Sequence, residues 1–168
     1  MTQVWAQYAR YNRLANEKLY EACGGLSDAE YRRDLGAFFK SVHGTLNHLL
    51  LGDTIWMTRF EGGAHASTDL GAILHESFDA LRRARDGMDR RIERFFSNLP
   101  EGFERRSVRY VNNAGIDSED PLKVILPHFF NHQTHHRAQV HTLLSQLGRD
   151  PPVLDLHRVL RPNPPTLG

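Results

Sequence analysis

The stretch His128–His141 reads HFFNHQTHHRAQVH and holds five of the ten histidines in the chain. His128, His132 and His136 are four residues apart, so on a helix they form a stripe along one face. Two neutral imidazoles one turn apart can chelate a transition-metal ion. The spacing leaves open which adjacent two bind the ion, while His135 points about 100° away from His136. The stretch therefore predicts a helix that carries half of a metal site.

Apolar residues recur at helical spacing over four long segments. They predict helices at residues 2–23, 41–60, 74–99 and 120–147, and a short helix after a capping box that begins at Ser27. Pro121 is expected at the first position of the last helix. In the third helix we expect the apolar residues to face inward and the arginines, Arg85 among them, outward. Residues 64–70 are expected to form a loop.

The segment 103–120 lacks the helical pattern. It combines strand-like alternation with turn residues, which predicts an irregular segment or a small hairpin between the third and fourth helices. The whole pattern indicates an all-α fold, a four-helix bundle, in a single domain of residues 1–168. Its core spans residues 2–148, and the tail of residues 149–168, with five prolines, is expected to lie across the surface.

Composition excludes several classes of protein. The net charge is +1, from 21 basic and 20 acidic residues, so the chain lacks the basic excess that nucleic-acid binding needs. No segment has the length and apolar character of a membrane span, so we expect no membrane partner. The single cysteine, Cys23, cannot form a disulfide within the chain, which fits a cytoplasmic location, and we expect it to be a small core residue.

The other half of the metal site requires a ligand from another helix, and His48 is the best candidate. It lies mid-helix among leucines, where an unpartnered imidazole is costly, whereas His43 is nearer the helix start and more easily solvated. Three histidines leave the fourth coordination position to water or substrate, as in catalytic zinc sites. Asp53 is expected either to orient a neighbouring side chain of the site or to form a salt bridge.

Arg137 and Gln139 flank His136, and we expect them either to bond neighbouring helices or to line the mouth of a pocket. The sequence lacks the motifs of several other catalytic chemistries. The chain has no glycine-rich phosphate loop, no Gly-x-Ser-x-Gly motif and no Cys-x-x-Cys pair. It also lacks the Glu-x-x-His pairs of di-iron bundles and the His-Glu-x-x-His motif of zinc proteases.

Three motifs resemble the DinB (DinB/YfiT-like) family of metalloproteins. Residues 130–139, FNHQTHHRAQ, resemble its signature Phe-Asn-His-Gln-Thr-His-His-Arg-Gly-Gln, with Ala138 at the usual glycine. Residues 44–56 resemble the second-helix pattern of the family, and residues 11–16 its Tyr-Asn-x-Trp-Ala-Asn opening, with Leu14 at the usual tryptophan. The resemblance covers residues 8 to 148, and the histidine-rich motif is its specific part.

The resemblance implies an up-down-down-up four-helix bundle, commonly a homodimer. It also implies one divalent ion, usually zinc or nickel, held by three histidines whose motif positions are His48, His132 and His136. Relatives include thiol S-transferases that act with bacillithiol or mycothiol, and a maleylpyruvate isomerase. The expected partners are therefore a low-molecular-weight thiol and an electrophilic substrate. The family name, which refers to DNA-damage induction of one member, implies a stress-response role.

The residues support three hypotheses. The first is a metal-dependent enzyme of the thiol S-transferase or hydrolase type, with an open coordination position and with His128 and His135 beside the site. The second is a non-catalytic, metal-stabilised bundle with a stress-response or interaction role, in which His128, His135 or Asp53 closes the coordination sphere. The third is a plain helical interaction protein that has His132 and His136 on its surface.

Overall fold

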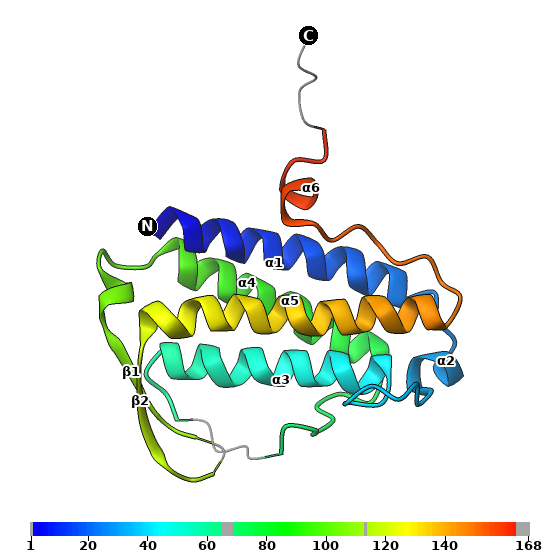
Figure 1. The fold of residues 1–168 in the computed structure, drawn as a ribbon, viewed down its shortest axis with the longest axis horizontal. Helices are drawn as coiled ribbons and strands as arrows, with labels where there is room; N and C mark the ends of the chain where they lie inside the picture. The colour runs from blue at the N-terminus through cyan, green and yellow to red at the C-terminus, as the bar shows by residue number, and fades with distance from the viewer. Residues whose placement is uncertain (1, 65–68, 113, 164–168) are drawn as a thin grey trace.

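The computed structural model describes residues 2–64, 69–112 and 114–163 (Figure 1). Over these residues the chain is mostly helical, as predicted, but it also contains a two-stranded sheet. The all-α class is therefore corrected to a mostly helical fold with one small sheet. The predicted loop at 64–70 falls largely on residues 65–68, which lie outside the described residues.

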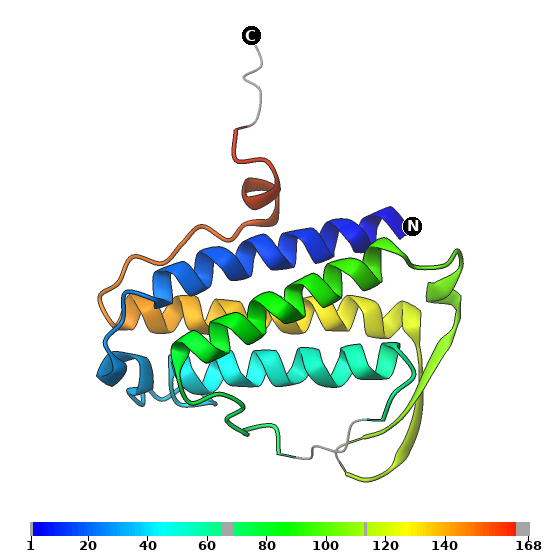
Figure 2. The ribbon, with the colours of Figure 1, turned by 180° about the vertical axis from the view of Figure 1, so that it is seen from behind.

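Four long helices lie side by side, namely α1 (Thr2–Cys23), α3 (Val42–Phe60), α4 (Phe78–Ser97) and α5 (Leu122–Gln146) (Figures 1 and 2). Helix α1 packs against α4 and α5, and α3 packs against the same two helices. Helices α1 and α5 run in one direction, and α3 and α4 run in the other (Figure 1). The residues of the histidine stretch therefore lie on a helix that has α3 on one side and α1 on the other.

Serine side chains set several helix starts. The short helix α2 (Asp28–Arg32) begins at the predicted capping box, where the backbone N–H of Ser27 donates to Glu30 Oε2 over 2.8 Å and Ser27 Oγ accepts from the Glu30 N–H. Helix α3 begins after Ser41 and α4 after Ser77. Because Ser77 caps α4 by accepting from the Ala80 N–H, that helix begins at residue 78 rather than at 74.

A hairpin separates α4 from α5, so of the two alternatives for residues 103–120 the hairpin is confirmed. After the short 3₁₀ helix η1 (Phe103–Arg105), strand β1 (Ser107–Val111) pairs antiparallel with β2 (Asp117–Pro121). The position expected for Pro121 was wrong, because this residue ends β2 opposite Ser107 and α5 starts at the next residue. Its ψ of 130° is extended, which suits a strand end.

Apolar side chains from the four long helices form the core. Among the fully buried are Leu19, Leu46, Met57, Leu81, Ile92, Leu126 and Leu144. Cys23 is buried among them, as predicted, and burial raises the pKa of its thiol to about 12. The outward orientation expected for Arg85 was wrong: its side chain is 1% exposed because carboxylates on α3 and α4 hold it inside.

The tail runs along the outer surface of α1 from residue 149 to residue 160, as predicted, and the chain then turns away from the bundle (Figures 1 and 2). It includes a short helix, α6 (Leu156–Leu160), that the sequence did not indicate. Val159 packs against Tyr11 and Ala15 of α1, and the Tyr11 hydroxyl donates to the Leu154 carbonyl over 2.7 Å. Within the described residues, the helices lack the combination of length and apolar character needed to cross a membrane.

Candidate metal centre

Three histidines from two helices converge between α3 and α5. His48 Nε2 lies 3.3 Å from His132 Nε2 and 3.2 Å from His136 Nε2. One ring nitrogen from each of the three lies within 4.8 Å of the others. Two nitrogens bound to a tetrahedral zinc ion at about 2.0 Å are about 3.3 Å apart, so this spacing suits ligands of one ion.

His48 is oriented through its second ring nitrogen. Its Nδ1 lies 2.8 Å from the backbone carbonyl oxygen of Leu70. A carbonyl only accepts, so Nδ1 carries the proton, and the lone pair of the neutral ring is on Nε2. The atom that faces the other two histidines is therefore free to bind a cation.

Asn47 holds the segment after Leu70 against α3. Its side-chain oxygen accepts from the backbone N–H groups of Leu74 and His75, both over 2.9 Å, and its amide donates to the His43 carbonyl. The side chain is fully buried. Sequence reasoning missed this residue, for which the available signal was a polar amide next to His48 on an apolar helix.

His136 is oriented by a residue of its own helix. Its Nδ1–H donates to Gln139 Oε1 over 2.8 Å, which leaves the lone pair on Nε2. The Gln139 amide in turn donates to His135 Nε2 over 3.1 Å. Gln139 and His135 therefore lie behind His136, on the side away from the converging nitrogens.

His132 fits against the backbone of α3 at Gly52. A methyl group added at Gly52 would lie 2.8 Å from His132 Cε1, which is closer than two carbon atoms pack. The absence of a side chain at this position is thus what allows the imidazole to reach the cluster. The sequence contained this glycine four residues after His48, but nothing in the pattern connected it with α5.

An aromatic side chain covers His48. The Phe39 ring stacks on the imidazole with centroids 3.8 Å apart and 17° between the planes, and it meets His136 edge-on. Phe39 lies in the link before α3, where Lys40 has a left-handed φ of 66°. A side chain at Gly44 would collide with the Phe39 carbonyl, so this glycine permits the close approach. Phe39 therefore forms an apolar wall of the site.

Burial lowers the pKa of all three imidazoles. The pKa of His132 falls to about 3 because the ring is desolvated, and the neighbouring His136 and His48 lower it further. Desolvation also lowers the pKa of His136 to about 4 and the pKa of His48 below its ordinary value. The rings are therefore neutral at pH 7, which is the form that binds metal ions.

Comparison with known proteins identifies the family of this chain. The model of the DinB family matches residues 1–166. The chain belongs to the DinB family. This DinB-family chain is also similar to Protein DinB from Bacillus subtilis (strain 168), with 27% identity over 143 residues, which are 82% of this chain and 83% of that protein. The resemblance read from the histidine motif is confirmed.

The other candidate residues of the DinB-family chain are not part of the three-histidine cluster. His128 is exposed, with its ring against Trp56 and its centroid 6.0 Å from that of His132. Arg137 is buried and bonds the neighbouring helix α1, one of its two expected roles. Asp53 forms a salt bridge with Arg85, which is one of the two roles expected for it.

That salt bridge belongs to a buried polar network beside the histidine cluster. Asp53 Oδ2 accepts from Arg85 Nη1 over 2.5 Å, and its Oδ1 accepts from the Gln133 amide over 2.8 Å. Arg85 Nη2 lies 3.0 Å from Asp89 Oδ1. These side chains are 2% exposed or less, so their charges compensate one another inside the protein.

Two asparagines of α1 extend the network to Arg137. The amide nitrogens of Asn12 and Asn16 donate to Asp89, over 3.2 and 2.9 Å, while the side-chain oxygens of both accept from Arg137 Nη1. Two carboxylates and two guanidinium groups are thus joined across all four long helices. Sequence reasoning missed Asn12, Asn16, Arg85, Asp89 and Gln133 as parts of one network.

Proposed function

We propose that this DinB-family protein binds one divalent transition-metal ion, zinc or nickel, through the Nε2 atoms of His48, His132 and His136. The observation that carries the proposal is the separation of 3.2 and 3.3 Å between these nitrogens, which matches the ligand spacing of a tetrahedral ion. The hydrogen bonds to Leu70 and Gln139 support it, because they leave the lone pairs of His48 and His136 directed at one another.

We further propose that the coordination sphere has an open position. Among the residues that the structure describes, no fourth histidine, cysteine or carboxylate joins the group. Asp53 is engaged by Arg85 and Gln133, and His135 Nε2 is engaged by Gln139. An open position favours a metal-dependent enzyme over a closed site that only stabilises the fold.

An ion bound there would lower the pKa of a coordinated water or thiol toward neutrality. The chain supplies the surroundings: Phe39 shields one face of His48 from water, and Gln139 fixes the ring of His136. The reaction that we propose is the transfer of a low-molecular-weight thiol to an electrophile. The thiol sulfur forms a bond to the electrophilic carbon, the bond from that carbon to its leaving group breaks, and the leaving group takes up the proton that the thiol loses. Hydrolysis is the variant in which water replaces the thiol. The thiol reaction is favoured because thiol-dependent enzymes occur among proteins that this chain resembles.

We also propose a topology, an oligomeric state and a cellular role for the protein. We infer that the four long helices are an up-down-down-up four-helix bundle, supported by their directions and by the packing of α1 and α3 on α4 and α5 (Figure 1). Family resemblance supports a cytoplasmic homodimer with a stress-response role.

Metal titration of the purified, chelator-treated protein tests the site. We expect about one zinc or nickel ion per chain, and a loss of at least about 100-fold in affinity in a His48→Ala, His132→Ala double variant. His135→Ala is the matched control, because this ring lies outside the cluster, and its affinity should stay within about tenfold of the unsubstituted protein. Less than about half an ion per chain, or unchanged affinity in the double variant, contradicts the proposal.

An activity screen tests the reaction separately. Bacillithiol and mycothiol are each incubated with an electrophilic fluorogenic acceptor, using protein with and without zinc. We expect conjugation that requires metal and disappears in His132→Ala. If metal-loaded protein accelerates conjugation with neither thiol, the transferase assignment fails while the metal site stands.

A further inference from the structure

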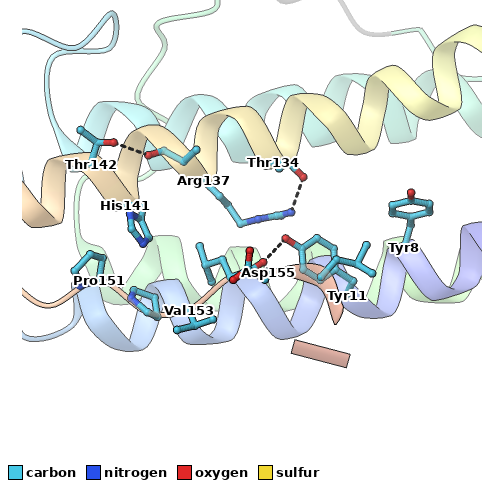
Figure 3. Close-up of a pocket in the computed structure, with 13 residues that line it drawn as sticks. Tyr8, Tyr11, Thr134, Arg137, His141, Thr142, Pro151, Val153 and Asp155 are labelled. Atoms are coloured by element: carbon cyan, nitrogen blue, oxygen red, sulfur yellow. Dashed lines mark hydrogen bonds between the residues drawn. The ribbon is translucent and has the colours of Figure 1, made fainter. Parts of the chain in front are cut away.

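A cavity lies on the opposite side of α5 from the histidine cluster. It is open to solvent, has a volume of about 610 Å³ and is lined by α5, by α1 and by residues 151–156 of the tail (Figure 3). Ala138 lines it, two residues after His136 and so about 200° around the helix. Small-molecule sites occupy about 300–1,000 Å³, so this cavity is of suitable size for an organic ligand.

The lining of this cavity combines an apolar body with one cationic group. Tyr8 and Tyr11 of α1 and Pro151 and Val153 of the tail contribute apolar surface (Figure 3). The cationic group is Arg137, which extends from α5 toward α1. Its guanidinium carbon lies 5.1 Å from the centre of the Tyr11 ring.

The hydrogen bonds of the Arg137 guanidinium group are concentrated on Nη1. Nη1 donates to the oxygens of Asn12 and Asn16, whereas Nη2 has a long hydrogen bond of 3.3 Å to the Thr134 hydroxyl. Nε has no partner among the described residues, although the side chain is 2% exposed. A buried donor without an acceptor is energetically costly. The edge formed by Nε and Nη2 is therefore the part of the guanidinium group that can accept a ligand.

The geometry points to a carboxylate. Nε and Nη2 form the edge of a guanidinium that binds the two oxygens of a carboxylate in parallel. We propose that the cavity binds a small organic monocarboxylate, with its carboxylate on this edge of Arg137 and its apolar body against Tyr8 and Tyr11. The hydrogen bonds that Arg137 makes are all to neutral groups, Asn12, Asn16 and Thr134, so a carboxylate would be its first directly bound anion.

Among the described residues, Asp155 is the one acidic side chain that lines the cavity. It is exposed, so water screens its repulsion of a bound carboxylate. The Tyr11 hydroxyl holds the adjacent Leu154 carbonyl, which fixes the wall of the cavity that the tail supplies. The site is thus formed by α1, α5 and the tail together, and it is independent of the metal-binding proposal.

Calorimetric titration with benzoate at neutral pH tests the proposal, with benzamide as the uncharged ligand of the same shape. The full chain is treated with chelator first, so that benzoate cannot coordinate a bound ion. We expect a dissociation constant of about 1 mM for benzoate and binding at least about tenfold weaker for benzamide. Equal binding of the two ligands, or no benzoate binding up to about 20 mM, overturns the proposal.

A substitution that fills the cavity locates the binding. Ala138→Phe leaves the buried network untouched because Ala138 is exposed, and it should weaken benzoate binding at least about tenfold. Ser145→Phe is the matched control, since it adds the same ring two turns further along the exposed side of α5, outside the cavity lining. Unchanged benzoate affinity in Ala138→Phe overturns the proposal. Tighter binding of inorganic phosphate than of benzoate also overturns the assignment to a carboxylate.

Discussion

The histidine cluster and the buried Asp–Arg network lie on the same two helices, α3 and α5, but they differ in how their polar atoms are satisfied. On α5, residues of the cluster alternate with residues of the network. His132 and His136 face the cluster, and the residues that follow them, Gln133 and Arg137, face the network. In the network, carboxylates meet guanidinium groups and amides. In the cluster, the neutral imidazoles of His48 and His136 turn acceptor nitrogens toward each other, and His132 Nε2 lies 3.3 Å from His48 Nε2.

This difference distinguishes a structural polar network from a candidate metal site. Buried charges that meet opposite charges hold helices in register, as Asp53, Arg85 and Asp89 do. Buried acceptors that converge without a donor are costly unless a cation joins them. On this reasoning, substitutions in the network should change the stability of the protein, and substitutions around the cluster should change its affinity for metal.

The largest expected effect is in the network. Asp53→Ala leaves the buried Arg85 without one of its two carboxylates, so we expect the free energy of unfolding to fall by about 3–5 kcal/mol in urea denaturation. Glu61→Ala is the control, because it breaks a more exposed pair with Arg91 and should cost no more than about 1 kcal/mol. Similar losses in the two variants would contradict the structural role of the network.

The second-largest expected effect is a loss of stability when the metal-free protein is acidified. The pKa of His132 is about 3 in the folded state and near 6.5 when unfolded, so between these pH values the unfolded chain binds more protons. The contribution of His132 to the free energy of unfolding is therefore undiminished above pH 6.5. This contribution should fall by about 2 kcal/mol as the pH drops to about 4, allowing for the partial exposure of the ring, and the lowered pKa of His136 acts in the same sense.

Comparison with His132→Ala isolates this effect. Burial raises the pKa of Asp89 to about 6, so its protonation acts in the opposite sense over part of the same range. The variant retains Asp89 but lacks His132, and its free energy of unfolding should fall less between pH 6.5 and 4. Parallel pH profiles for the two proteins would mean that His132 does not titrate as proposed.

Removal of the group that orients His136 should weaken metal binding without unfolding the protein. Gln139→Ala deletes the acceptor of the Nδ1–H, and we expect zinc affinity to fall about tenfold, which is about 1.4 kcal/mol. Gln139→Glu keeps an acceptor at the same position and should retain the affinity. Competition with a chromogenic chelator measures both, and equal affinity in all three proteins would exclude an orienting role.

The smallest effect concerns the space at Gly52. The added methyl group of Gly52→Ala would push against His132 Cε1, so we expect a loss of about fivefold in zinc affinity, or about 1 kcal/mol. Gly87→Ala in α4 meets nothing within 4 Å and should instead raise the free energy of unfolding by about 0.5–1 kcal/mol. Isotherms of zinc binding and urea denaturation curves for the two variants test this contrast.

Much of the fold was predictable because its signals are local. The His132–His136 spacing, the capping box at Ser27 and the alternation in Ser107–Val111 each specify a structure within a few residues. The position of Pro121 was mispredicted because its residue type is compatible with both the end of a strand and the first turn of a helix, and pairing with Ser107 decides between them.

The network could not be predicted because its partners are distant in the chain. Arginine is mostly exposed in proteins, so the pattern of α4 assigned Arg85 to the outer face. Its burial depends on Asp53, 32 residues earlier, and that pairing exists only once α3 and α4 are packed. The same reason applies to Gly52 and to Phe39, whose contacts with His132 and His48 follow from the approach of separate elements.

The hydrogen bond from His48 to Leu70 has a consequence for how this site changes in evolution. Its acceptor is a backbone carbonyl, which all twenty residue types possess, so the side chain at position 70 is free to vary without loss of the bond. What must be kept is the length and path of the chain between Leu70 and the two amides that Asn47 binds. Selection should therefore tolerate substitutions at position 70 and reject insertions or deletions between it and Leu74.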